Sequence, residues 1–303
     1  MSRRYRAAQL NVQQLLTFRK VFEMGGYASA ASESDLSVAS VWQHIRAVER
    51  AYGVRLFRKV GRRVEATEEA AKLHNALDEI LVNLESTFDS IGSESAENAP
   101  IRIVTGNRMM LEDLAEPFAA FQKKFSNRLL IRSGDNRRTE DLLMSEQADL
   151  GLSLEPAPER QSAKIHYESG YFVDFLAVAP KRHPFAKSKT SGLREIVKHP
   201  LVVTQPGTHG REALEQALYR ERLEAEIAVE TDNSAITIAC VQAGMGLGIV
   251  AGRPDGQLSR KLVCLSLRRQ LGRRQIVLMW RKGRILTEPM LTLVETVKSF
   301  RAK

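Results

Sequence analysis

Residues 28–67 constrain the fold of this chain more than any other stretch. The order of apolar and polar residues predicts a short helix, a tight turn, a second helix and then a basic hairpin. Ser37 is a good N-cap for the second helix, and Tyr52-Gly53 ends it. This order is typical of a winged helix-turn-helix, in which the second helix enters the major groove of DNA and the hairpin, or wing, meets the phosphates.

The positive charge of the chain is concentrated in the same region. The 303 residues carry a formal net charge of +9, from 45 Lys and Arg against 36 Asp and Glu. The first 66 residues hold 12 basic and 5 acidic residues, which gives +7 and leaves only +2 for the remainder. A basic head on a near-neutral body predicts an acidic partner for the head, and nucleic acid fits better than a membrane surface.

A long helix is predicted directly after the wing. Thr67 is a capping residue, and Glu68-Glu69 place acids at the positive end of the helix dipole. We expect this helix to pair with its copy in a second subunit, although it could also pack on its own domain. The small, polar segment 92–100 predicts a linker after it. Apolar residues at alternating spacings of three and four predict a coiled-coil-like seam along the helix: Leu73, Leu77, Ile80, Leu84 and Ile91, with Phe88 slightly off the stripe.

From residue 101 onward the chain alternates between predicted strands and predicted helices. This alternation favours parallel sheets with helices on both faces, and the length suits two such lobes. In α/β lobes, ligands bind where strands end and helices begin, because helix N-termini present unpaired N–H groups there. The junction residues are therefore candidate effector contacts, although caps and turns are the commonest use of these residue types.

The first 70 residues closely resemble the LysR-type transcriptional regulators. A weaker resemblance to the effector-binding region of that family continues through residues 148–151, 183–184 and 241–248. The family's N-terminal pattern appears here, in order and without gaps, as Gly25-Gly26-Tyr27, Ala30-Ala31, Ser37, Ile45 with Val48-Glu49, Tyr52-Gly53, Leu56-Phe57, Arg62 to Val64 and Thr67.

The resemblance implies a mixed fold. An N-terminal winged helix-turn-helix (residues 1–66) would be followed by a dimerisation helix and hinge (67–99). An α/β two-lobed domain similar to periplasmic binding proteins (100–303) would complete the chain. By that analogy, lobe one takes about 100–166 and 268–303, and lobe two takes about 167–267. The resemblance also implies a homodimer or homotetramer, an unknown small-molecule effector, and RNA polymerase as a further partner.

The predicted DNA contacts lie on the second helix and the wing. The helix departs from the family's usual S-Q-P-A-V-S, because Val38 and Ala39 offer only apolar contact and Trp42 stands where a small serine is common. Gln43 can pair with adenine and Arg46 with guanine or phosphate, while wing cations would contact phosphates without specifying sequence. Trp42 could pack on the sugar-phosphate backbone or against a neighbouring helix. The full set of predicted contacts is Ser37, Val38, Ala39, Trp42, Gln43, Arg46, Lys59, Arg62 and Arg63.

The predicted effector contacts lie at four strand-to-helix junctions in the α/β part. Arg108 beside the first junction would suit a carboxylate, though it could also be exposed. The full set is Thr105, Gly106, Asn107, Arg108, Ser133, Thr204, Gly207, Thr208, His209 and Asn233.

Other functions find little support in the sequence. There is no G-x-S-x-G, no G-x-x-x-x-G-K and no H-E-x-x-H, so no enzyme and no cofactor is predicted. The two cysteines and six histidines lack metal-ligand spacing, which predicts no metal site. No long apolar stretch or signal peptide is present, so we expect a cytoplasmic protein.

These observations predict a DNA-binding transcriptional regulator controlled by a small molecule held between two lobes. One alternative keeps the DNA reader but has a degenerate, ligand-free effector domain. A second alternative is a solute-binding protein in which the head is incidental.

Overall fold

The computed structural model describes residues 10–61, 63–91, 98–187 and 192–299. They form two compact units. The head unit contains the residues up to Ile91 and the short segment Lys282–Ile285, and the effector unit contains the others.

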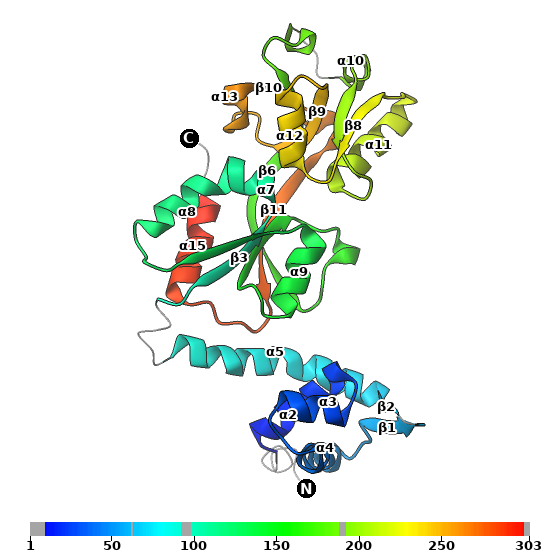
Figure 1. Ribbon diagram of the computed structural model, residues 1–303, viewed down its shortest axis with the longest axis vertical. Coiled ribbons are helices and arrows are strands. Elements are labelled where there is room, and N and C mark those ends of the chain that lie inside the picture. The colour runs from blue at the N-terminus through cyan, green and yellow to red at the C-terminus, as the bar shows by residue number, and fades with distance from the viewer. Residues whose placement is uncertain (1–9, 62, 92–97, 188–191, 300–303) are drawn as a thin grey trace. The chain divides into compact units, whose positions relative to one another are not determined.

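The described residues of the head unit form four helices and a two-stranded hairpin, in the order predicted for a winged helix-turn-helix. Asn11 and Gln14 form a capping box at the start of the first helix. The Ser37 hydroxyl accepts a hydrogen bond from the Ser40 amide at 3.0 Å, and Gly53 ends that helix at φ 73°, where glycine is favoured. The elements are α2 (Val12–Met24), α3 (Tyr27–Glu33), α4 (Val38–Tyr52), β1 (Phe57–Val60), β2 (Arg63–Ala66) and α5 (Glu68–Ser90) (Figure 1).

One hydrophobic core holds the head unit together. Phe18 of α2 is fully buried, with its ring centroid 6.4 Å from that of Phe22 and 5.9 Å from that of Phe57. The remaining buried members of the core come from α2, α3, α4, α5 and the connection between α4 and β1: Val21, Ala30, Ala31, Val41, Ile45, Val48, Leu56, Ala70, Leu77 and Leu81.

A buried carboxylate fixes where the wing starts. Glu49 of α4 is only 7% exposed, and its Oε1 accepts hydrogen bonds from the amides of Leu56 (2.9 Å) and Phe57 (3.4 Å). These amides would otherwise be buried without partners, which is costly. The Glu49 carboxylate therefore helps to fix the position of the wing relative to α4.

The apolar stripe of α5 divides between two environments. Leu77 is buried in the head core, and Leu73 packs against it. Ile80, Phe88 and the following Ile91 are 61%, 77% and 74% exposed in the single chain. The predicted seam is therefore partly internal, and its exposed part is a large apolar surface on a long helix.

The effector unit is built on one nine-stranded sheet with short and long helices around it (Figure 1). Its strands are β3 (Ile101–Thr105), β4 (Leu129–Ser133), β5 (Leu150–Leu154), β6 (Ile165–Pro180), β7 (Leu201–Thr204), β8 (Ile227–Thr231), β9 (Leu247–Gly252), β10 (Leu262–Ser266) and β11 (Arg273–Arg281). Its α-helices are α7 (Asn107–Met109), α8 (Ala115–Gln122), α9 (Asn136–Met144), α10 (Leu193–Ile196), α11 (His209–Glu221), α12 (Ser234–Gln242), α13 (Leu258–Lys261), α14 (Arg268–Leu271) and α15 (Glu288–Ser299). A π-helical turn spans Met110–Leu114, and 3-10 turns span Pro158–Arg160 and Pro184–Lys187.

The sheet is mixed rather than wholly parallel. The strand order is β4-β3-β5-β11-β6-β9-β7-β8, with β10 paired to β6. The β3–β4, β3–β5, β7–β8 and β7–β9 pairs are parallel, as predicted, whereas β11 and β6 pair antiparallel with each other and with all their other neighbours. These two long strands join the two parallel groups. Because β6 spans the expected lobe boundary near residue 166, the division into lobes stays a prediction.

Helices cover both faces of the sheet. Ile276 and Leu278 of β11 belong to one apolar cluster, with α8 and α15, whereas Val277 and Met279 belong to another, with α9. Alternate residues of a strand point to opposite faces, so these clusters lie on opposite sides of the sheet. The predicted arrangement of helices on both faces is confirmed.

The A-D-L-G segment at the start of β5 has a structural role. Asp149 is buried and accepts hydrogen bonds from the Arg102 amide (2.7 Å) and guanidinium (2.6 Å), which joins β5 to β3. A Cβ at Gly151 would lie 2.3 Å from Cγ2 of Thr139, so α9 can approach the strand only because this position is glycine.

Candidate DNA-binding face and effector cleft

The predicted recognition residues of α4 form one exposed face. The helix buries Val41, Ile45 and Val48 against the core, which directs the other side of the cylinder to solvent. Arg46 is half-buried at the end of this face. We call this surface the recognition face; its exposed members are Ser37, Val38, Ala39, Trp42 and Gln43.

Trp42 is held by its neighbour one turn along α4. The Arg46 guanidinium lies over the Trp42 ring, 5.0 Å from the centroid, and also pairs with Glu49 at 3.2 Å. This cation–π contact leaves Trp42 50% exposed. Close by, Nδ1 of His44 lies 2.9 Å from the Thr17 hydroxyl, so this imidazole links α4 to α2.

The wing presents exposed cations on a short antiparallel ribbon. Lys59 and Arg63 are exposed, on β1 and β2 respectively. Arg58 pairs with Glu65 on the opposite strand at 3.1 Å. Arg62, a predicted phosphate contact, lies outside the described residues.

A cleft of about 800 Å³ opens in the effector unit. This volume falls within the range typical of small-molecule sites. Nine of the ten predicted effector residues line it: Gly106, Asn107, Arg108, Ser133, Thr204, Gly207, Thr208, His209 and Asn233.

Thr105 is the predicted residue that the described lining does not include. It is 1% exposed, and its hydroxyl points to Sδ of Met109 at 4.0 Å. Thr105 is the last residue of β3, and its side chain belongs to the buried side of the strand rather than to the junction.

Arg108 lines the cleft but is already paired. It is 7% exposed, and its Nη2 lies 3.0 Å from Oδ2 of Asp113, which also accepts a hydrogen bond from the Tyr171 hydroxyl at 3.1 Å. The charge that was expected to suit a ligand carboxylate is therefore balanced inside the protein.

Three α-helices of nine or more residues, α9, α11 and α12, begin at the cleft, as does the three-residue α7, and the three longer helices differ in their capping. The side chains of Asp135 and Asn233 accept hydrogen bonds from the first-turn amides of α9 and α12. At α11 the Thr208 hydroxyl makes no such bond and instead donates to the Gln205 carbonyl at 2.9 Å. Among these three described helix starts, α11 has first-turn amides without a side-chain cap, which is suited to an anion.

Asn136 and His209 connect the two sides of the cleft. Nδ2 of Asn136 donates to the Leu154 carbonyl at 2.7 Å and lies 3.4 Å from Nε2 of His209, while the Ser153 hydroxyl donates to its Oδ1. Burial lowers the pKa of His209, with the nearby Arg274 and Arg160 acting in the same direction against Glu212. The lowered pKa favours the neutral imidazole, in which one ring nitrogen donates and the other accepts a hydrogen bond.

Asn136 lines the cleft but was not among the predicted effector residues. Asp135 followed by a polar run was the available signal, since Asp is a favoured N-cap. Its carboxylate accepts from the Arg138 amide at 2.8 Å and starts α9 at Asn136.

Comparison with protein-family models identifies both units. A model described as the LysR substrate binding domain matches residues 95–301, and one described as a bacterial regulatory helix-turn-helix protein of the lysR family matches residues 12–71. The chain belongs to the LysR family. It is a DNA-binding transcriptional regulator with an effector-binding domain, and the family is not one of enzymes.

Relatives of this LysR-family chain match nearly its whole length. The RuBisCO operon transcriptional regulator of Allochromatium vinosum is 24% identical over 285 residues, covering 92% of each chain. The structure of a LysR family regulator from Pseudomonas aeruginosa, PA01, aligns with a TM-score of 0.58 at 20% identity, covering 97% of this chain and 100% of the other. The effector binding domain of QuiR, solved in complex with shikimate, aligns with a TM-score of 0.54 at 15% identity, covering 66% of this chain and 96% of the other.

No helix in the described part of the chain combines the length and the apolar character needed to cross a bilayer.

Proposed function

We propose that this LysR-family regulator reads DNA through the recognition face of α4 and binds phosphates through its wing. The observation that carries the proposal is the exposed face itself, on which Trp42 and Gln43 project beside the apolar Val38 and Ala39. Gln can pair with adenine, and small apolar side chains can contact thymine methyl groups. Lys59 and Arg63 supply the sequence-independent attraction to the backbone.

We propose that the regulator works in the cytoplasm as a homodimer or a homotetramer. The exposed Ile80, Phe88 and Ile91 on and beside α5 support pairing of this helix with its copy, because burying them removes large apolar surfaces from water. A two-fold dimer would present two recognition helices to two half-sites of an interrupted palindrome. RNA polymerase is a further proposed partner, by resemblance to the family alone.

We propose that the effector is a small molecule that carries an anionic group. The group would bind at the N-terminus of α11, where the amides have no side-chain cap and the Thr208 hydroxyl and His209 imidazole are in reach. The exposed Arg160 lines the same cleft. The open volume favours this proposal over a degenerate domain without a ligand.

Replacing Gln43 with alanine is expected to remove specificity, whereas replacing Lys59 with alanine is expected to remove general affinity. Gln43→Ala should weaken binding to the preferred sequence by about tenfold to a hundredfold and leave binding to random DNA unchanged, since a bidentate base contact discriminates by about 1–3 kcal/mol. Lys59→Ala should weaken both about equally and lower the slope of log K against log salt by about 1. Fluorescence anisotropy with labelled duplexes measures both quantities.

Matched controls are available in the effector unit. Gln122 and Lys123 are exposed at the end of α8, so Gln122→Ala and Lys123→Ala make the same chemical changes away from the head. Both should bind DNA like the wild type. Equal losses on specific and random DNA in Gln43→Ala would contradict its role as a base contact.

Replacing Thr208 with valine is expected to lower affinity for an anionic effector about tenfold, because the hydroxyl, which would turn from the Gln205 carbonyl to donate to the charged group, is lost. A thermal shift titration with shikimate, inorganic sulfate and small carboxylates finds the ligand and measures the change, since a ligand of the folded state raises its unfolding temperature. Thr296→Val is the control, because the Thr296 hydroxyl also donates to a backbone carbonyl but lies on α15. An effector that binds Thr208→Val and wild type equally would place the anion elsewhere.

A further inference from the structure

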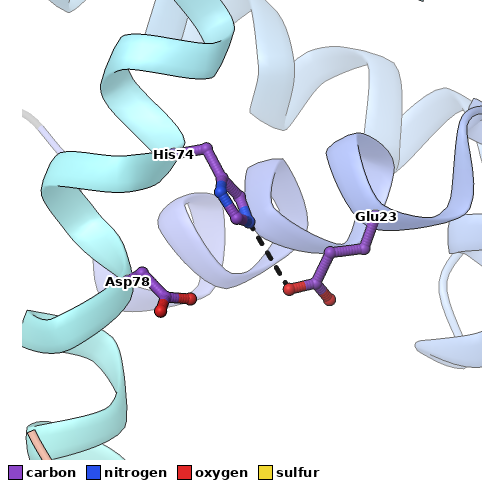
Figure 2. A group of neighbouring side chains, drawn as sticks. All are labelled: Glu23, His74 and Asp78. Carbon is purple, nitrogen blue, oxygen red and sulfur yellow. Dashed lines mark ion pairs between the residues drawn. The ribbon is translucent and has the colours of Figure 1, made fainter. Parts of the chain in front are cut away.

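Three side chains with metal-binding groups meet inside the head unit, away from the recognition face. Glu23 comes from the last turn of α2, and His74 and Asp78 lie one turn apart on α5. Figure 2 shows the three side chains directed into the space between the two helices. Their ligand atoms all lie within 4.8 Å of one another.

His74 is the central member of this group. The side chain is 5% exposed, and its ring stacks on Phe22 with a centroid distance of 4.2 Å and an interplanar angle of 19°. Nε2 lies 3.5 Å from Oε1 of Glu23 but has no hydrogen-bond partner among the described residues. A buried ring nitrogen without such a partner is costly, unless another group binds it.

We propose that Glu23, His74 and Asp78 form a binding site for a divalent transition-metal ion of the Zn²⁺ type. Imidazole nitrogen and carboxylate oxygen are both ligands of zinc. Three protein ligands leave a position for water, and the side chain of Glu23, which is 46% exposed, opens the site to solvent.

The observed geometry is close to that of such a site. Zinc bonds of about 2.0–2.1 Å in a tetrahedron place neighbouring ligand atoms roughly 3.3–3.5 Å apart. The Nε2–Oε1 separation of His74 and Glu23 is 3.5 Å. Asp78 is 5% exposed and four residues from His74 on the same helix face, so rotation of its side chain brings an oxygen into range.

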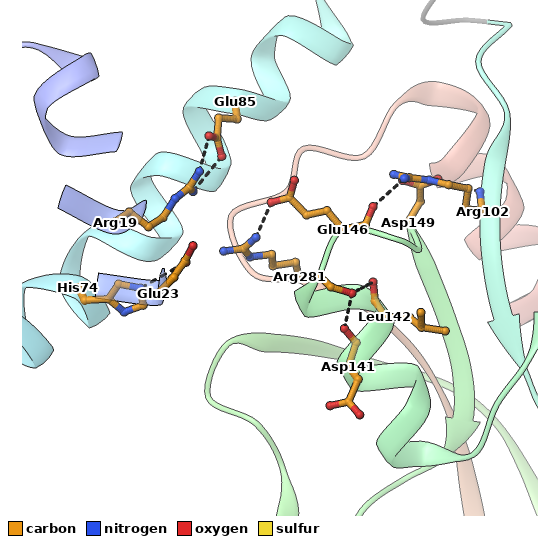
Figure 3. A network of polar contacts seen from close by, with 11 residues as sticks. Arg19, Glu23, His74, Glu85, Arg102, Asp141, Leu142, Glu146, Asp149 and Arg281 are labelled. Atoms are coloured by element: carbon orange, nitrogen blue, oxygen red, sulfur yellow. Dashed lines mark hydrogen bonds and ion pairs between the residues drawn. The ribbon is translucent and has the colours of Figure 1, made fainter. Parts of the chain in front are cut away.

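A bound ion would connect the helix-turn-helix to the long helix. Glu23 belongs to the packed head, whereas His74 and Asp78 belong to α5. A contact between α2 and α5 already exists one turn earlier on α2. There Nη1 of Arg19 donates to Oε2 of Glu85 at 2.9 Å, and Nη2 donates to Oε1 at 2.5 Å. Figure 3 shows this pair beside Glu23 and His74. The metal would add a second link and stabilise the head unit.

The linear sequence did not reveal this site. Metal motifs are found by the spacing of ligands along the chain, and Glu23 lies 51 residues before His74. The fold, not the spacing, brings the third ligand to the His-x-x-x-Asp pair on α5.

The test is metal binding by the full-length protein after chelator treatment and dialysis. Isothermal titration with Zn²⁺ should give one saturable site per chain, and Co²⁺ should give visible absorption bands of a protein-bound ion. Glu23→Gln and Asp78→Asn should each weaken the site about tenfold or more. In a Trp280→Phe background, Zn²⁺ should raise the unfolding temperature of the head, followed by Trp42 fluorescence, and raise it less in either carboxylate variant at the same Zn²⁺ concentration.

Glu33→Gln is the matched control, because Glu33 is an exposed glutamate on α3 of the same unit. It should bind Zn²⁺ like the wild type. The two carboxylate variants keep side-chain size and do not disturb the Phe22 stack, so circular dichroism should show them folded. No saturable Zn²⁺ binding in the wild type, or wild-type affinity in either Glu23→Gln or Asp78→Asn, would overturn the proposal.

Discussion

Phe18→Ala is expected to abolish DNA binding and to leave the effector unit folded. Phe18 is fully buried at the centre of the head core, against Phe22 and Phe57. Loss of a buried phenylalanine costs about 3–5 kcal/mol. Small domains have total stabilities near the low end of ~5–15 kcal/mol, so this loss leaves much of the head unfolded.

The two tryptophans of the chain allow the two units to be observed separately. Trp42 lies in the head unit and Trp280 lies on β11 in the effector unit. In a Trp280→Phe background, urea unfolding followed by fluorescence reports the head, and in a Trp42→Phe background it reports the effector unit. Phe18→Ala should shift only the first transition.

Met24→Ala is the control for this experiment. Met24 lies on the same helix but is 47% exposed, so its removal leaves no cavity. DNA affinity in Met24→Ala should match the wild type. A Phe18→Ala protein that binds DNA normally would show that the packing of the head does not support the recognition face.

Asp113→Asn is expected to destabilise the effector unit by about 3–5 kcal/mol, because it leaves the Arg108 guanidinium buried without its counter-charge. Burial by itself would lower the pKa of Arg108, but Asp113, Tyr171 and Glu112 more than offset that effect, and the net shift of the pKa is upward. The charged form is therefore maintained by its neighbours.

The π-helical turn explains why these two residues meet. Residues five apart in an α-helix point roughly 140° away from each other. The wider π turn at Met110–Leu114 brings Arg108 and Asp113 to the same side. Such turns occur frequently at functional sites, and this one lies beside the cleft.

The double variant Arg108→Met, Asp113→Leu separates the charge effect from the effect of shape. Replacing both members of a buried ion pair with apolar residues is often neutral, so it should recover most of the stability lost in Asp113→Asn. Asp141→Asn on α9 is the control, because Asp141 is exposed. Urea unfolding followed by Trp280 fluorescence measures all three variants. A wild-type unfolding midpoint in Asp113→Asn would contradict the importance of the pair.

Local patterns predicted the head unit well. Ser37, Gly53 and Thr67 mark helix ends through capping and turn chemistry that depends on a few adjacent residues, and the structure has helix ends there. The exposure of Trp42 and Gln43 followed from the helical spacing of the buried Val41 and Ile45. Both side chains are exposed in the structure, and their contact with bases stays a prediction.

Features that depend on distant residues were not predictable in the same way. The antiparallel pairing of β6 with β11 joins residues about a hundred positions apart. Arg108 was predicted to suit a ligand carboxylate. In the structure it pairs with Asp113 across a π-helical turn, and no residue propensity indicates such a turn. Glu23 and His74 meet only when α2 packs on α5. These contacts follow from tertiary packing, which a single sequence records weakly.

The most direct test of the central claim is selection of DNA by the full-length protein from a random duplex pool, followed by a salt titration on the selected sequence. We expect enrichment of an interrupted inverted repeat, bound at least about a thousandfold more tightly than random DNA, with log K falling linearly as log salt rises. Failure to enrich any sequence, or affinity that does not change with salt, would contradict it.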